Sequence, residues 1–288
     1  MEFNQAFSPP YGLTTTHEQT ILSSVGRKVR VPKPINTFLD ASTEQIIEVA
    51  GVRLVVHCNT QANDPDAPLI MIIPGWLGNS RSSYVVSAAL QLWQQGFNVV
   101  RINLRDHGDT AHLNSGLFHS ALIEEVIELA QHLMTGGRSA PDHRRPCGLI
   151  GYSLGGNFAL RLARAIPKLT TLAICPAIDP YATMRQIESS VIYRNYFIIK
   201  WRKLFREKQR HFPTLYDFGP AMKLSRVASL TDYFIKYHSE FDDTESYCAA
   251  YDLSGSAMAG VNAQIVAAAD DPIIPAHVEK SFCEHTSE

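Results

Sequence analysis

Cysteine is scarce in this sequence and is not arranged in pairs. The chain has five cysteines, an odd number, and no two of them form a C-x-x-C pair. Disulfide frameworks and zinc ribbons need such pairs at regular spacings. The cysteine pattern therefore excludes both classes and fits a reducing compartment.

A surplus of charge and a long apolar run are also missing. The 26 lysines and arginines nearly balance 28 aspartates and glutamates, whereas nucleic-acid binding needs a basic surplus. No apolar stretch approaches the ~20 residues that span a bilayer, and the start, MEFNQAFSPPYGL, lacks the basic and apolar regions of a secretory signal. These absences predict a cytoplasmic protein that binds no nucleic acid.

What the sequence does contain is a regular alternation of short apolar runs and amphipathic segments. A short continuous apolar run is typical of a strand covered on both faces. We expect a hairpin over 45–58, strands over 69–75, 97–104, 147–152, 169–177 and 263–270, and helices over 83–96, 117–134 and 154–166. This order predicts an α/β fold, a mostly parallel sheet with helices on both faces.

Two segments interrupt the alternation. Residues 1–40 are polar and contain several prolines, which predicts an arm laid over the domain rather than a core element. Residues 181–260 are rich in aromatic and basic side chains and predict a helical lid over the carboxyl ends of the strands. The core of the domain would then comprise residues 41–180 and 261–288.

The stretch Gly151-Tyr152-Ser153-Leu154-Gly155 fits the pattern G-x-S-x-G at a transition from strand to helix. Such a sharp turn forces strained dihedral angles on the serine, and the flanking glycines avoid clashes. The hydroxyl then stands at a helix N-terminus, where backbone N–H groups favour developing negative charge. Phosphate-binding turns carry other patterns, which are absent here. The motif therefore indicates a nucleophilic serine.

Partners for this serine can be named from their positions at the same edge of the sheet. The Gly-rich turn at 74–80 suggests the backbone N–H of Trp76 as one oxyanion donor, with that of Leu154 as the other. Asp270 and Asp271 follow the last strand. We favour Asp271 as the acid and assign Asp270 to capping, because adjacent residues point to opposite sides.

These motifs resemble those of α/β-hydrolases, and more narrowly of the YheT-like branch, which includes plant embryogenesis-associated proteins and animal abhydrolase-domain lipases. The resemblance rests on SPPYGLTTTHEQTIL (8–22), PGWLGNS (74–80), LFHSALIEEV (117–126), GYSLGGN (151–157) and ADDPIIP (269–275). It implies a serine carboxylic-ester hydrolase with Ser153 as nucleophile and Asp271 as the acid of the triad.

The base of such a triad has no clear candidate. In this fold the histidine follows the acid after a further helix and strand, but only 17 residues follow Asp271. His285 and His277 lie there without that strand, so we expect that neither is the base and that the last strand and helix are missing. His107 follows a strand at the right edge and is a weak substitute. A bond from His107 to a neighbouring carboxylate is the alternative.

Two functional hypotheses follow. The first is a hydrolase that cleaves short- to medium-chain or lipid-like esters through an acyl-enzyme at Ser153, with no cofactor and no metal. The second is a binding module that keeps the strand-to-helix turn at Ser153, the elbow, but lacks turnover. The basic segment 200–211 suggests a weak contact with anionic lipid headgroups, or else a solvated lid face with buried side-chain stems.

Overall fold

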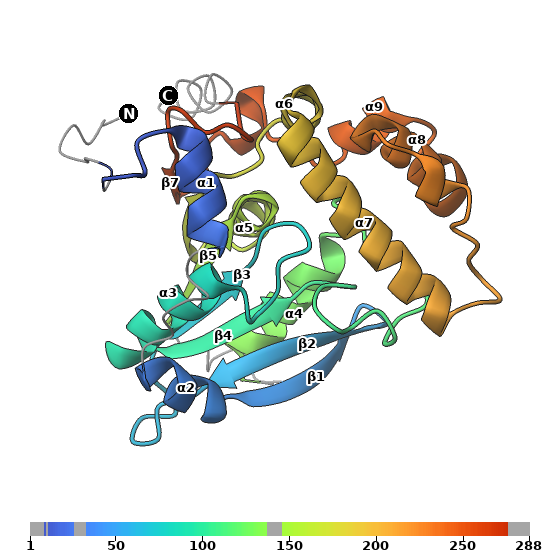
Figure 1. The fold of residues 1–288 in the computed structure, drawn as a ribbon. Coiled ribbons are helices and arrows are strands. Elements are labelled where there is room, and N and C mark those ends of the chain that lie inside the picture. Colours follow the sequence, from blue (N-terminus) through green and yellow to red (C-terminus); the bar gives the residue numbers. More distant parts are fainter. Residues whose placement is uncertain (1–8, 10, 26–32, 137–145, 276–288) are drawn as a thin grey trace.

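The computed structural model describes residue 9 and residues 11–25, 33–136 and 146–275 of the 288-residue chain (Figure 1). The helices and strands are, in chain order, α1 (Thr16–Val25), α2 (Lys33–Asp40), β1 (Thr43–Val49), β2 (Val52–Asn59), β3 (Leu69–Ile73), α3 (Ser83–Gln94), β4 (Asn98–Asn103), α4 (Glu124–Met134), β5 (Cys147–Tyr152), α5 (Leu154–Ala165), β6 (Thr170–Ile174), α6 (Pro180–Ser189), α7 (Val191–His211), η2 (Ala221–Lys223), α8 (Val227–His238), α9 (Thr244–Ala249), η3 (Gly255–Met258) and β7 (Ala263–Val266).

The strands form one sheet of the predicted kind. Its order is β1-β2-β4-β3-β5-β6-β7, in which β1, β2 and β4 pair antiparallel and all later pairs are parallel. Tyr152 at the end of β5 is in register with Ile174 of β6, which is in register with Val266 of β7. The carboxyl ends of these strands therefore share one edge of the sheet.

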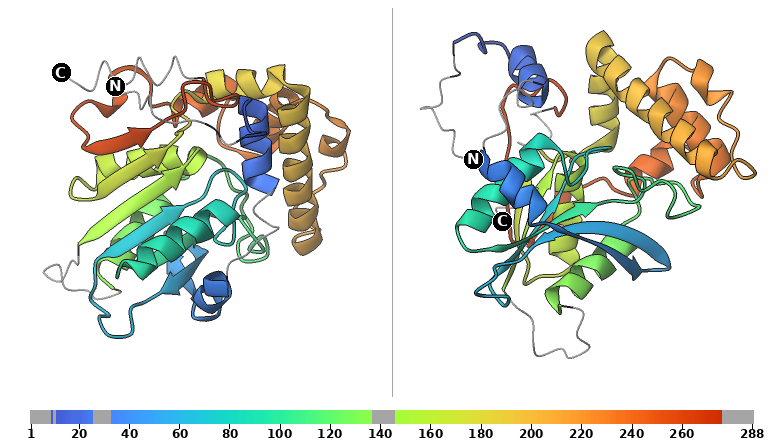
Figure 2. Two further views of the ribbon diagram at one scale, coloured as in Figure 1. Left: turned by 60° about the vertical axis from the view of Figure 1, so that its left-hand side comes forward. Right: turned by 60° about the horizontal axis from the view of Figure 1, so that its bottom comes forward.

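Helices cover both faces of the sheet, as predicted for an α/β-hydrolase fold. On one face α4 and α5 pack in a core that includes Leu129 and Phe158. On the other face α3 contributes Val85 and Ala89, together with Phe38 of α2. Figure 2 shows α6–α9 gathered beyond the sheet rather than on its faces.

The helix predicted over 117–134 is shorter than expected, because it begins at Glu124. The backbone before it is bound by other parts of the protein. The N–H of Phe118 donates to Asp106 (2.8 Å), and the N–H of Ser120 donates to the hydroxyl of Tyr247 (3.0 Å). Residues 117–123 form a loop, whose backbone is bound by side chains from other segments of the chain.

The described part of the predicted N-terminal arm contains α1 and α2, two helices that the sequence did not reveal. His17 of α1 lies 2.9 Å from the hydroxyl of Tyr193 on α7, and Figure 2 shows the two helices side by side. Phe38 of α2 is fully buried and contacts Trp93, with ring centroids 5.8 Å apart. This side chain belongs to the core, contrary to the expectation for residues 1–40.

The segment predicted as a lid folds into α6–α9 around an apolar cluster of its own. Phe205 and Phe218 stack in its centre, with ring centroids 4.2 Å apart. Among the described residues, none of the helices combines the length and apolar character needed to traverse a bilayer.

Candidate active site

Ser153 occupies a strained turn between β5 and α5. Its dihedral angles, φ 53° and ψ −118°, are costly for a residue with a Cβ atom. The surrounding backbone holds it there, because its N–H donates to Ile174 O (2.9 Å) and its carbonyl accepts from Asn157 N (3.1 Å). The sequence motif predicted this geometry.

The glycines around Ser153 are needed for close packing. A Cβ atom at Gly155 would overlap the carbonyl oxygens of Ile73 and Pro74, and one at Gly151 would overlap the backbone of Gly155. The elbow is thus pressed against the end of β3. A Cβ built on Gly75 would lie 3.3 Å from that of Ser153, so the loop after β3 runs directly beside the serine.

This loop carries the first of the two predicted oxyanion donors. Gly78 N donates to Gly75 O (2.8 Å) and closes a tight turn, in which Leu77 has a φ of 50°. Neither Trp76 N–H nor Leu154 N–H donates a hydrogen bond to another described residue. Trp76 and Leu154 both line the pocket that Ser153 lines.

His107 holds this loop through hydrogen bonds, so its ring nitrogens are not free to act as a base. Its Nε2 accepts from Leu77 N (2.9 Å), while its Nδ1 lies 2.8 Å from Arg105 O. Complete burial lowers the pKa of His107 to about 4, so the ring is neutral. Both nitrogens bind backbone groups, and neither binds the carboxylate considered as the alternative. His107 therefore fixes the conformation of Leu77.

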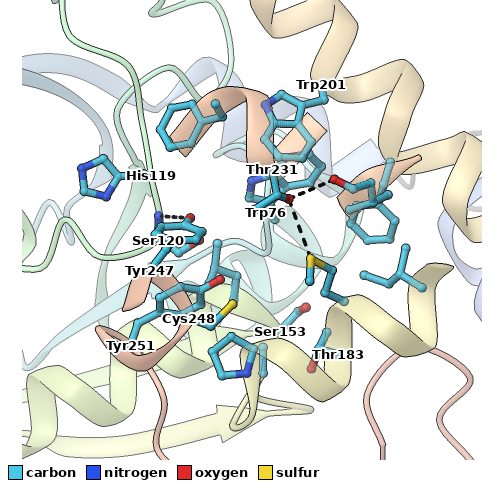
Figure 3. Close-up of a pocket in the computed structure, with 18 of the residues that line it drawn as sticks. Trp76, His119, Ser120, Ser153, Thr183, Trp201, Thr231, Tyr247, Cys248 and Tyr251 are labelled. Atoms are coloured by element: carbon cyan, nitrogen blue, oxygen red, sulfur yellow. Dashed lines mark hydrogen bonds between the residues drawn. The ribbon is translucent and has the colours of Figure 1, made fainter. Parts of the chain in front are cut away.

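A cavity of ≈ 140 Å³ lies over Ser153 between the sheet edge and the lid (Figure 3). Most of the residues that line it are apolar, and Figure 3 shows the hydroxyl residue Thr183 beside Ser153. The lining side chains are Trp76, Phe118, His119, Ser120, Ser153, Leu154, Ala177, Pro180, Thr183, Met184, Ile187, Phe197, Trp201, Leu204, Val227, Thr231, Phe234, Tyr247, Cys248, Tyr251 and Ile273.

The long lid helix α7 rests on the loop that follows β3. Trp76 contacts Phe197 and Trp201, with ring centroids 5.4 and 5.5 Å apart. The ammonium group of Lys200 lies 3.5 Å from Leu77 O. The position of α7 and the shape of the loop are therefore coupled.

The basic segment of α7 is not simply a solvated face. Lys208 is fully buried, and its Nζ lies 2.7 Å from Asp106 and 2.7 Å from Asn114 O. Burial raises the pKa of Asp106 and lowers that of Lys208, against their mutual attraction. Lys203 and Arg206 on the same helix are exposed.

The two aspartates after β7 differ in their contacts. Asp271 Oδ1 accepts from the N–H groups of Ile273 (2.8 Å) and Ile274 (3.0 Å) and so closes a turn. Asp270 is exposed. Asp271 follows β7 at the edge where Ser153 follows β5, and its charge helps to raise the pKa of Tyr193, after the effect of burial.

No described histidine joins Ser153 and Asp271 in a triad, and His277 and His285 lie outside the described residues. His119 lines the pocket and was not predicted from the sequence. Its stretch was predicted to be helical, and nothing in the residues 117–123 signals the loop. Within the described part of the chain, no three His, Cys, Asp or Glu side chains gather closely enough to hold a metal ion.

Known proteins resemble this chain in sequence and in fold. The model of the alpha/beta hydrolase family matches residues 70–287. The chain is 26% identical to mouse sn-1-specific diacylglycerol lipase ABHD11 over 155 residues, 54% of this chain and 46% of that protein. It is 25% identical to a Haemophilus influenzae protein named as an esterase/lipase over 115 residues, 40% of this chain. The matches span 36% and 46% of these relatives' lengths, less than half of each.

Among solved structures, the esterase Pf2001 of Pyrococcus furiosus has a similar fold. It superposes with a TM-score of 0.55 at 14% identity, covering 90% of this chain and 79% of the esterase. At this identity the likeness establishes the fold alone.

Proposed function

The chain belongs to the alpha/beta hydrolase family, and from this premise we propose that it is a serine hydrolase that cleaves carboxylic esters through an acyl-enzyme at Ser153. The observation that carries the proposal is the strained Ser153 in the wall of an apolar cavity, beside two residues whose backbone N–H groups donate to no described residue. The motifs also favour the narrower YheT-like branch.

In the proposed reaction, Ser153 Oγ attacks the carbonyl carbon of the ester. The carbonyl oxygen gains the negative charge, which the N–H groups of Trp76 and Leu154 stabilise. Each such donor is worth about 10²–10³ in rate. Collapse of the intermediate expels the alcohol and leaves the acyl-enzyme, which water hydrolyses.

Proton transfer in this reaction requires a base. We propose that Asp271 orients it, since Oδ1 is occupied by backbone N–H groups and Oδ2 accepts from no described residue. The base itself is assigned to no described residue. Without one, triad enzymes retain only about 10³–10⁴-fold acceleration over water.

The cavity sets the size of the proposed substrate. Its volume of ≈ 140 Å³ is similar to the ~150 Å³ of an apolar protein cavity that binds benzene. A chain of about six carbons therefore fits, which corresponds to a short- or medium-chain ester. The names of the relatives, a lipase and an esterase/lipase, agree with small or lipid-like esters as substrates.

A weak contact between α7 and an anionic membrane surface is a second element of the proposal. Lys203 and Arg206 are exposed on this helix, and so are the apolar side chains of Ile192 and Ile199. Apolar and cationic side chains on one helix suit the interface of a bilayer. Lys208, buried against Asp106, makes no such contact.

The alternative is a hydrolase-like binding module that has no turnover. The observation in its favour is that no described histidine joins Ser153 to Asp271. It predicts ligand binding in the cavity without release of product, so Ser153-dependent ester cleavage would exclude it.

A fluorophosphonate probe tests the proposed nucleophile. We expect the probe to label the purified protein at Ser153, as shown by peptide mass spectrometry, and to spare Ser153→Ala. Ser189→Ala, which removes an exposed hydroxyl, is the control and should label like the wild type. Equal labelling of the wild type and Ser153→Ala would refute the assignment. p-Nitrophenyl hexanoate then measures turnover in the same three proteins.

A further inference from the structure

The loop after β3, residues 74–80, has its backbone N–H groups tied to other atoms of the protein. Within the described residues, the N–H groups of residue 75 and of residues 77–80 each donate a hydrogen bond, whereas that of Trp76 donates none. The acceptors are, in chain order, Tyr84 Oη, His107 Nε2, Gly75 O, Ser82 Oγ and Asn103 Oδ1. The loop is therefore fixed on both sides of the group that we propose as an oxyanion donor.

Tyr84, in the first turn of α3, binds this loop immediately before Trp76. Its hydroxyl accepts from Gly75 N at 3.0 Å. The carbonyl of Gly75 accepts from Gly78 N at 2.8 Å, and it belongs to the same planar peptide group as Trp76 N–H. Because both the N–H and the carbonyl of Gly75 are held, the direction of Trp76 N–H is held as well.

The ring of Tyr84 contacts the other half of the proposed site, the elbow. It packs edge-on against Tyr152, which directly precedes Ser153, with ring centroids 4.8 Å apart. Burial raises the pKa of Tyr84, so the phenol is neutral at physiological pH. One side chain thus touches the loop with its hydroxyl and the elbow with its ring, and it sets the spacing between them.

Gly78 allows the loop to close onto the hydroxyl of Tyr84. This glycine does not have the positive φ that would by itself favour glycine. A Cβ atom built on it would lie 2.6 Å from the hydroxyl of Tyr84 and 2.9 Å from Gly75 O. No side chain fits at this distance, so residue 78 has to be glycine as long as Tyr84 binds the loop.

We propose that Tyr84 is a positioning residue, which acts through Gly75 to hold Trp76 N–H where the oxyanion of an ester substrate forms. Tyr84 is not among the residues that line the cavity, so it contacts no substrate there. This inference rests on the proposed ester hydrolysis. Loss of the tyrosine hydroxyl then slows the acylation of Ser153 without weakening the binding that precedes it.

Tyr84→Phe tests the inference, because it keeps the ring against Tyr152 and removes the acceptor for Gly75 N–H. The rate of labelling by the fluorophosphonate is measured against probe concentration, which separates the maximal rate from the half-saturating concentration. One oxyanion donor is worth about 10²–10³ in rate, so we expect the maximal rate to fall by about tenfold or more. The half-saturating concentration should change by less than about twofold.

Tyr216→Phe is the matched control. The hydroxyl of Tyr216 also binds a backbone group, but it donates to Ser115 O (2.6 Å) rather than accepting from residues 74–80. This variant should label like the wild type.

Amide hydrogen exchange measures the position of the loop without any reaction at Ser153. Peptides that cover residues 74–80 are followed by mass spectrometry in the wild type and both tyrosine variants. Gly75 N–H loses its acceptor in Tyr84→Phe, so we expect these peptides to exchange faster in that variant and at the wild-type rate in Tyr216→Phe.

Gly78→Ala reaches the same contact from the side of the loop. Its Cβ atom displaces the hydroxyl of Tyr84, so we expect the same fall in the maximal rate of labelling. This variant decides the question if Tyr84→Phe does not fold.

Three results would overturn the inference: a wild-type maximal rate in Tyr84→Phe, a loss confined to the half-saturating concentration, or unchanged exchange at residues 74–80. Failure of the proposed function looks different. In that case the wild type itself is not labelled at Ser153, while the exchange of residues 74–80 is still faster in Tyr84→Phe.

Discussion

His107 makes the stability of this protein depend on pH in a way that can be calculated. In the folded chain its pKa is lowered from 6.5 to about 4, first by burial and then by the charge of Lys200. Between these two values the unfolded chain binds a proton that the folded chain does not. Stability therefore falls as the pH drops from about 6.5 towards 4.

The size of the effect follows from the difference in pKa. One pKa unit corresponds to about 1.4 kcal/mol, so this residue alone removes about 3 kcal/mol of unfolding free energy across the whole window. About 2 kcal/mol of this is lost between pH 8 and pH 5. Other buried histidines contribute with the same sign, which makes a variant necessary to isolate His107.

His107→Gln keeps a hydrogen-bond acceptor near Leu77 but does not titrate. Urea unfolding of the wild type and His107→Gln at pH 8 and pH 5 gives the two losses of free energy. We expect the loss in His107→Gln to be smaller by about 2 kcal/mol. His112→Gln removes an exposed histidine and should unfold like the wild type at both pH values.

The reasoning is refuted if the losses of free energy in His107→Gln and the wild type agree within about 0.5 kcal/mol. A second measurement concerns the loop after β3, residues 74–80, which carries the proposed oxyanion donor of Trp76. His107→Leu leaves Leu77 N–H without its acceptor, so we expect labelling of Ser153 by the fluorophosphonate to slow by about tenfold or more. His107→Gln should label faster than His107→Leu.

Two further substitutions test the packing that surrounds the site. Gly155→Ala forces a Cβ into the carbonyls that end β3, and we expect it to destabilise the protein by about 3 kcal/mol or more in urea unfolding, whereas Gly219→Ala on the surface should cost little. Lys208→Met leaves Asp106 buried without a counter-charge and should cost about 3–5 kcal/mol. The exposed Lys203→Met on the same helix should change thermal unfolding very little, and an equal loss in both lysine variants would contradict the burial argument.

The sequence predicted those features that have a local physical cause. Apolar runs gave the parallel strands, and the glycines around Ser153 gave the elbow, because only glycine fits where the backbone of one element presses on another. The loop at 74–80, which contains Gly75, was also predicted from its glycines. Local pattern and final structure agree at these positions.

The sequence did not predict features that depend on contacts between distant segments. Residues 117–123 have a helical pattern, but in the fold they form a loop whose backbone binds Asp106 and Tyr247, which are distant in the sequence. His119 belongs to this loop and therefore lies in the wall of the cavity. Lys208 lies in a basic segment typical of a solvated face, and only the fold shows that Asp106 is its partner.

The attachment of α7 has a mechanical consequence. Near its carboxyl end the helix is pinned by Lys208, whose separation from Asp106 would strand two opposite charges in a dry interior. The other end is held as well, since Tyr193 is buried and its hydroxyl lies 2.9 Å from His17 of α1. The aromatic side chains that touch Trp76 lie between these two attachments, so α7 is fixed over the backbone beside Ser153.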